Sequence, residues 1–260
     1  MLIKPSVISV IGAGGKTSLI CSLAYQYLSN NLSVCITTTT KMQILATANT
    51  FFAQKGEILS QGLIFHYNNK TKEWEKYLSN KSRIERNGFN ICYLEEDLIK
   101  ENLNQEKLPF FCQVGKKITE EKIGSIKEKT LQELAKRYQV VLVEADGAKG
   151  KPLKGWRNFE PVIADISEQI IMVIDGSTIF RPISEKNIFA LDLFKKQFVK
   201  REEEITPDIY RRILDVKKEP WCRIKNIEKK DLYCYISHAD LLDEKYQELI
   251  IKTISGSKNV

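Results

Sequence analysis

Long apolar runs, paired cysteine motifs and histidines are what this sequence lacks or has little of. No stretch approaches the roughly 20 apolar residues that a membrane-spanning helix needs, so no membrane partner is expected. The six cysteines are scattered without a C-x-x-C pair, which predicts reduced thiols in a cytoplasmic protein. With only two histidines, a structural zinc site is not expected. No signal peptide is expected either, because the first predicted strand begins directly after residues 1–5.

Repeats, low-complexity tracts and clustered charge are absent as well. The chain of 260 residues can bury one sizeable core. Its formal net charge is +7, but lysines alternate with acidic residues, as in the stretch 120–129, which is typical of a solvated helix face. Nucleic-acid binding would need a clustered basic stripe, so no nucleic-acid partner is expected. The excess positive charge is compatible with an anionic small ligand or an acidic partner surface.

A glycine-rich turn near the start of the chain joins a predicted strand, 7–11, to a predicted helix that begins at Lys16. Backbone amides in such a turn can surround anionic oxygens. Lys16 is predicted to reach the outer phosphates of a nucleotide, and the Thr17 hydroxyl to bind Mg²⁺. The other interpretation is an ordinary turn with a solvated lysine. The predicted nucleotide-binding residues here are Gly12, Ala13, Gly14, Gly15, Lys16, Thr17 and Ser18.

The loop is shorter than the usual phosphate-binding pattern. Only two residues separate Gly12 from Gly15, whereas the common motif places four between its glycines. This short form is similar to the loop of Mur ligases and folylpolyglutamate synthetases. It indicates phosphate binding without fixing the type of reaction.

A second signal is a buried strand that ends in acids, predicted over 139–147 (QVVLVEADG). The carboxyl ends of parallel strands meet at one sheet edge, so Glu144 and Asp146 should lie beside the glycine-rich turn. Strand alternation would put both on the same side. Asp146 is predicted to bind Mg²⁺ with Thr17, and Glu144 to position water or an acceptor. The alternative interpretation is that the two acids only cap structure or lie on the surface. In the main interpretation, Lys16, Glu144 and Asp146 form the predicted catalytic set.

Three further segments should reach the same edge. The predicted strand 32–40 ends in four threonines before Lys41. The Thr39 hydroxyl could bind Mg²⁺ or order water, and Lys41 could neutralise phosphate charge, unless the threonines are only good strand residues. The basic loop 147–154 adds Lys149, which could clamp a phosphate or a carboxylate-bearing acceptor. The last predicted strand ends in Ser-His-Ala-Asp, where many P-loop GTPases carry Asn-Lys-x-Asp. Asp240 is therefore a candidate contact to the base, with guanine selection left open.

Alternating strands and helices predict an α/β fold, a three-layer P-loop NTPase-like domain with a mostly parallel sheet. We expect one domain over 1–260, with an insertion or subdomain around 42–108. Threonine at 206 before Pro207 predicts a helix start. The other expected elements are helices at 42–54, 74–86, 119–138, 188–199 and 241–254, strands at 89–94, 110–114, 169–175 and 232–236, and a strand or hairpin at 56–67.

Three segments together resemble the YqeC family. They are IGAGGKTSL at 11–19, VCITTTTK at 34–41, and VLVEADGAKGKPLK at 141–154 followed by EPVI at 160–163. The resemblance implies a P-loop type nucleotide-binding fold. It also implies an accessory role in maturing selenium-dependent molybdenum hydroxylases or their molybdenum cofactor.

The leading hypothesis is a Mg²⁺-dependent protein that binds ATP or GTP and hydrolyses it during that maturation. Its partners would be the nucleotide and the molybdenum cofactor or a molybdenum hydroxylase. One alternative is an ATP-dependent ligase or transferase that acts on an anionic acceptor. Another is a non-catalytic switch that binds nucleotide without turnover.

Overall fold

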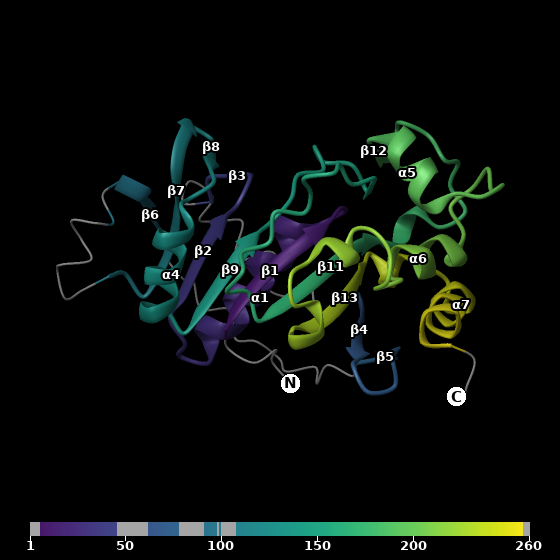
Figure 1. Ribbon diagram of the computed structural model, residues 1–260, viewed down its shortest axis with the longest axis horizontal. Helices are drawn as coiled ribbons and strands as arrows, with labels where there is room; N and C mark the ends of the chain where they lie inside the picture. Colours follow the sequence, from purple (N-terminus) through teal and green to yellow (C-terminus); the bar gives the residue numbers. More distant parts are fainter. Residues whose placement is uncertain (1–5, 46–61, 78–90, 98, 100–107, 257–260) are drawn as a thin grey trace.

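A mostly parallel sheet runs through the centre of the molecule (Figure 1). The computed structural model describes residues 6–45, 62–77, 91–97, 99 and 108–256. In this part of the chain eleven strands join in the order β3-β8-β7-β2-β9-β1-β11-β13-β4-β5, with β6 paired to β7. The six strands from β7 to β13 run parallel to one another. The predicted α/β class with a mostly parallel sheet is therefore confirmed.

The strands have the following bounds: β1 Val7–Gly12, β2 Val34–Thr38, β3 Lys41–Gln43, β4 Leu63–Asn68, β5 Glu73–Lys76, β6 Cys92–Glu95, β7 Phe111–Thr119, β8 Lys122–Gly124, β9 Val140–Glu144, β11 Gln169–Asp175 and β13 Asp231–Ser237. A separate two-stranded sheet pairs β10 (Leu153–Lys154) with β12 (Ile188–Phe189). The helices are α1 Lys16–Ser29, α4 Glu128–Arg137, α5 Leu191–Phe198, α6 Pro207–Ile213 and α7 Glu244–Ser255. Short 3₁₀ turns are η2 Gly176–Thr178, η3 Trp221–Arg223, η4 Ile227–Lys229 and η5 Ala239–Leu241.

Helices cover both faces of the sheet because the apolar side chains of each central strand alternate between the two faces. Ile8 and Val10 of β1 pack in one cluster with Leu19 and other residues of α1. Val7 packs on the opposite face with α4. On that same face β11 and β13 pack with α6 and α7. The result is a three-layer arrangement, as the sequence predicts.

Strand register brings several loop residues to one edge of the sheet. Glu144 at the end of β9 is paired with Val10 of β1 and with Thr38 of β2. On the other side of β1, Asp175 at the end of β11 is paired with Ser237 at the end of β13. The glycine-rich turn after β1 therefore lies between these strand ends. This is the carboxyl edge, where open α/β sheets bind ligands.

Two expected helices are wrong where the structure describes them. The segment expected as helix 42–54 begins within strand β3, and residues 46–54 lie outside the described residues. The segment expected as helix 74–86 begins within β5, and residues 78–86 lie outside the described part. In β5 only Trp74 is buried, against Trp221, while its neighbours are exposed. A tertiary contact therefore decides the local structure there.

The expected helix start at Thr119 is also wrong. Strand β7 continues to Thr119 and turns back into β8, where Ile123 is buried and packs against Gly115. Helix α4 begins at Glu128 instead, and the Glu96 carboxylate accepts hydrogen bonds from the Lys127 backbone N–H and the Thr130 hydroxyl. That capping group comes from a distant segment, which local sequence reasoning does not detect.

Other boundaries agree more closely with expectation. Strand β11 has the expected bounds, and α6 begins at Pro207 after Thr206. The segment expected as helix 188–199 contains the short strand β12 before α5. Helix α7 begins at Glu244, three residues after the end of η5. Of the segment expected as a strand or hairpin, 56–67, residues 56–61 lie outside the described residues, and the rest contains most of strand β4, which pairs with β5. The proposed subdomain around 42–108 stays a prediction. No helix in the described part of the chain is long and apolar enough to cross a membrane.

Candidate functional site

The glycine loop, residues 12–15, is held in a conformation that only glycine adopts easily. Gly12, Gly14 and Gly15 have φ values of +97°, +81° and +119°. A Cβ atom on Gly12 would lie 2.2 Å from the Val173 carbonyl oxygen, and one on Gly14 would lie 2.4 Å from the Asp175 Cβ. The loop is therefore tightly packed against the end of β11.

Helix α1 begins directly after this loop with an uncapped first turn. That turn contains no acidic residue, and Gly15 at the N-cap provides no side-chain hydrogen bond. The first N–H groups of a helix have no intrahelical partner, and the helix dipole adds partial positive charge there. The start of α1 is thus suited to bind an anion.

The Thr17 hydroxyl and the Glu144 carboxylate are brought together at the start of α1. Thr17 Oγ1 donates a hydrogen bond of 2.8 Å to Glu144 Oε2. Burial raises the pKa of Glu144, although the nearby Lys16 charge and the Thr17 hydrogen bond act in the opposite direction. A hydroxyl beside a carboxylate supplies the hard oxygen ligands that Mg²⁺ prefers.

Asp146 occupies a different environment from Glu144. Strand β9 ends at Glu144, so the expected alternation does not extend to Asp146. The Asp146 side chain is fully buried, and its Oδ2 accepts hydrogen bonds of 3.0 Å from both the Gly12 N–H and the Trp156 indole N–H. The prediction that Asp146 binds the metal stays a prediction. The described contacts of its carboxylate are to the glycine loop, the Trp156 indole and two lysine side chains.

Two lysines lie against the Asp146 carboxylate. Lys16 Nζ is 3.2 Å from Asp146 Oδ1 and donates a 2.7 Å hydrogen bond to the Gly12 carbonyl. Lys154 Nζ is 3.3 Å from Asp146 Oδ2 and 3.2 Å from Glu160 Oε2. Sequence reasoning missed Trp156 and Glu160 as members of this cluster. The nearest available signal was the KPLKGW run that follows the acids.

A pocket of about 270 Å³ opens in front of the glycine loop. Its wall consists of the loop, the start of α1, Glu144, Lys41 of β3 and the segment 147–151. Within that segment, residues 148–151 form a turn closed by a hydrogen bond of 2.9 Å from the Lys151 N–H to the Ala148 carbonyl. The predicted residues Lys41 and Lys149 thus reach the pocket, together with Lys151. The full lining is Gly14, Gly15, Lys16, Thr17, Ser18, Lys41, Glu144, Gly147, Ala148, Lys149, Gly150 and Lys151.

Five predicted residues do not line this pocket: Gly12, Ala13, Thr39, Asp146 and Asp240. The Thr39 hydroxyl donates a 2.6 Å hydrogen bond to the Val162 carbonyl. Asp240 is exposed on η5, beyond the end of β13. On the same strand end, the Ser237 hydroxyl donates a 2.6 Å hydrogen bond to the Gly14 carbonyl, and His238 Nδ1 lies 3.0 Å from Asp175 Oδ1. The end of β13 therefore contacts the glycine loop directly.

The described residues contain no cluster of three or more His, Cys, Asp or Glu side chains suited to hold a metal ion by themselves. Mg²⁺ commonly takes one or two carboxylates and completes its shell with phosphate oxygens and water. Thr17 and Glu144 match this coordination preference, because they lie beside the start of α1, where a phosphate could bind.

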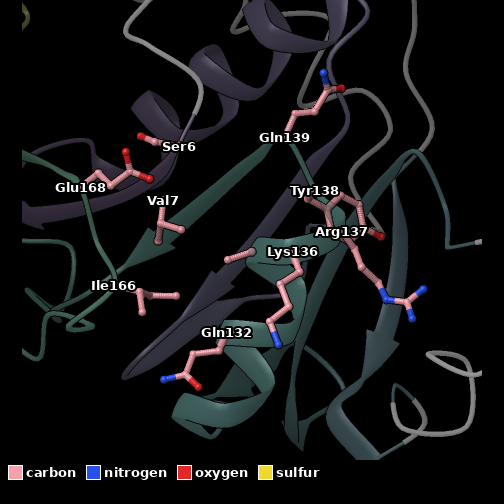
Figure 2. Close-up of a pocket in the computed structure, with 10 residues that line it drawn as sticks. Ser6, Val7, Gln132, Lys136, Arg137, Tyr138, Gln139, Ile166 and Glu168 are labelled. Atoms are coloured by element: carbon pink, nitrogen blue, oxygen red, sulfur yellow. The ribbon is translucent and has the colours of Figure 1, made fainter.

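A larger hollow lies away from the glycine loop. Its volume is about 630 Å³, and it sits near the start of β1 beside α4. Figure 2 shows Val7 and Glu168 on one side of it and Lys136 of α4 on the other. Size alone therefore does not identify the candidate site, and the side-chain chemistry favours the smaller pocket.

Comparison with known proteins gives two matches. A family model described as "YqeC protein" matches residues 8–192. A curated relative, "Uncharacterized protein YqeC" of Escherichia coli (strain K12), is 27% identical over 187 residues, which cover 71% of this chain and 57% of the relative. The match thus spans little more than half of that relative's length. No solved structure matches the chain.

The close packing of Gly14 generates a stability prediction. Gly14→Ala should lower the free energy of unfolding by about 3 kcal/mol, because a left-handed φ and severe crowding both oppose the new Cβ. Gly150→Ala is the matched control, since Gly150 has φ +73° but nothing within 4 Å of its Cβ position; it should lose about 1 kcal/mol. Urea denaturation measures both, and equal losses would contradict the described packing.

The buried charges around Asp146 generate a second stability prediction. Asp146→Asn should lower the free energy of unfolding by about 3 kcal/mol or more, because it leaves the ammonium groups of Lys16 and Lys154 without their shared partner. Asp165→Asn removes an exposed ion pair with Lys225 and should lose under about 1 kcal/mol. Thermal or urea unfolding of the two variants checks this, and a near-neutral Asp146→Asn would exclude a structural role for the cluster.

Proposed function

The chain belongs to the YqeC protein family, and on that premise we propose that it is a Mg²⁺-dependent nucleotide-binding protein that hydrolyses ATP or GTP. One observation carries the proposal. The Thr17 hydroxyl and the Glu144 carboxylate lie 2.8 Å apart at the uncapped start of a helix that follows a glycine loop. This is the arrangement of donors that a metal-bound triphosphate needs.

The phosphate groups would bind to backbone N–H groups and to lysine side chains. N–H groups of the glycine loop and of the first turn of α1 would surround the phosphate oxygens. Lys16 would contact the outer phosphates, while its ion pair with Asp146 holds the ammonium group at the loop. Lys41, Lys149 and Lys151 would neutralise charge on the open side of the pocket.

The metal would be held by Thr17 and Glu144. When bound, Mg²⁺ would neutralise charge on the outer phosphates. Asp146 would act mainly as a positioning residue, since it contacts the Gly12 N–H and the Lys16 ammonium. The sequence-based assignment of Asp146 as a metal ligand remains the alternative, which the variants below separate.

The family resemblance extends the proposal to a pathway. We propose that nucleotide binding serves the maturation of selenium-dependent molybdenum hydroxylases or of their molybdenum cofactor. A cytoplasmic location is part of this proposal, and it is compatible with six free cysteines in the described part of the chain, four of them buried. The molybdenum cofactor or a molybdenum hydroxylase would be the partner.

An ATP-dependent ligase or transferase is a second candidate, favoured by one observation. Lys41, Lys149 and Lys151 line the pocket and make no salt bridge with any carboxylate among the described residues. They could hold an anionic acceptor beside the outer phosphate. Such an enzyme would release phosphate only when its acceptor is present, whereas a hydrolase would show basal turnover. A non-catalytic switch would bind nucleotide with no turnover at all.

The metal assignment is tested by Thr17→Val, which removes the hydroxyl, and Thr17→Ser, which keeps it. Fluorescent nucleotide binding is measured with Mg²⁺ and with EDTA. In Thr17→Val and Glu144→Gln the affinity gained from Mg²⁺ should fall about tenfold or more, while Thr17→Ser retains it. Lys16→Ala should weaken binding under both conditions. The opposite result would be Mg²⁺ dependence that persists in Thr17→Val and Glu144→Gln but is lost in Asp146→Asn. That result would assign the metal to Asp146.

The contact to the base is tested at Asp240. A carboxylate can accept hydrogen bonds from the adjacent N–H donors of guanine or from the amino group of adenine. Asp240→Ala should therefore change the ratio of GTP to ATP affinity by about tenfold. The control is Asp231→Ala at the exposed start of the same strand, at the opposite sheet edge. An unchanged ratio in Asp240→Ala would remove Asp240 from the binding site.

A further inference from the structure

A strongly basic cavity of about 450 Å³ lies where α6 ends beside the β4–β5 hairpin. We call it the basic cavity. Its charged lining comes from three separate segments of the chain, and five of the seven charged residues lie within 211–218. The charged residues that line it are Lys72, Lys200, Arg211, Arg212, Asp215, Lys217 and Lys218.

The positive charges in this cavity exceed their local partners. Arg211 pairs with Asp208, Arg212 with Glu202, and Lys218 with Asp215. Lys72, Lys200 and Lys217 make no salt bridge with any carboxylate in the part of the chain that the structure describes. The basic cavity therefore keeps three uncompensated positive charges in a small volume, which produces a strong local attraction for anions.

Buried and half-buried groups hold the walls of the basic cavity. The Trp74 indole N–H donates a 2.9 Å hydrogen bond to the Leu214 carbonyl, and the Tyr67 ring lies 5.2 Å from the Trp74 ring. The Arg212 guanidinium donates a 2.6 Å hydrogen bond to the Phe198 carbonyl and pairs with Glu202. Side chains fixed in this way lose little conformational entropy when a ligand binds.

The basic cavity and the glycine loop lie at opposite edges of the sheet. Strand β4 runs antiparallel to β13, with Leu63 paired to Ile236 and His66 paired to Tyr233. The turn after β4 is therefore at the amino edge, away from the glycine loop (Figure 1). The two pockets share no lining residue. A ligand in the basic cavity would be separate from the proposed nucleotide.

We propose that the basic cavity binds a small phosphorylated molecule that carries at least two phosphate groups. Three uncompensated cations match the charge of two phosphates better than that of one. The volume falls within the range of small-molecule sites, roughly 300–1,000 Å³. The planar guanidinium group of arginine can also donate two parallel hydrogen bonds to two oxygens of one phosphate. The concave shape and the buried Trp74 and Tyr67 favour a compact ligand over an extended nucleic acid strand or acidic peptide.

The experiment is a calorimetric titration of the full chain with inorganic pyrophosphate in EDTA. It uses a Lys16→Ala background, which weakens binding at the glycine loop. Lys200→Gln with Lys217→Gln should raise the dissociation constant for pyrophosphate about tenfold or more, which corresponds to about 1.4 kcal/mol. Both lysines are exposed, so the fold is not at risk. The matched control is Lys195→Gln with Lys196→Gln, two exposed lysines of α5 outside the cavity.

The outcomes separate the proposal from its competitors. Pyrophosphate binding that is reduced in the cavity variant and kept in the α5 control supports a small-molecule phosphate site. Equal affinity in the cavity variant and the control overturns it. Competition assays with a single-stranded oligonucleotide and with an oligoglutamate peptide complete the test. Tighter, cavity-dependent binding of either one would assign the cavity to a macromolecule and also overturn the proposal.

Discussion

The buried carboxylate of Asp146 links the parts of the candidate site to one another. It accepts a hydrogen bond from the Gly12 N–H at the start of the glycine loop and lies within 3.3 Å of the ammonium groups of Lys16 and Lys154. A buried charge is tolerated only when it is paired and hydrogen-bonded. The loop, the start of α1 and the segment after β9 therefore cannot move independently. This constraint fixes the distance between the proposed phosphate and metal ligands.

Strand register then decides which acid meets the Thr17 hydroxyl. Glu144 is the last residue of β9, and its side chain points to the sheet face that α1 covers, as those of Val140 and Leu142 do. Thr17 lies in the first turn of that helix, so the two groups meet. Asp146 lies beyond the strand, where alternation no longer applies. Two acids that look equivalent in the sequence thus occupy different environments.

The glycine loop, the acidic strand end and their common sheet edge were predictable from the sequence, because each rests on local patterns and on parallel-strand geometry. The expected helix beginning at Trp74 was wrong because a contact with Trp221, far along the chain, stabilises a strand there. The pairing of Lys154 with Glu160 was not predictable for a related reason. The burial of this ion pair depends on how the segment 147–160 folds over the glycine loop, and residue spacing does not predict that folding.

Burial and pairing also separate the lysines by role, which composition cannot do. Lys154 is fully buried between two carboxylates, which neutralise its charge within the fold. Lys16 is nearly as buried but has one carboxylate partner and lines the pocket in front of the glycine loop. Lys200 and Lys217 are exposed and unmatched by any described acid. The net charge of +7 therefore includes cations at two opposite sheet edges, and only those left uncompensated by the fold remain available to an anionic ligand.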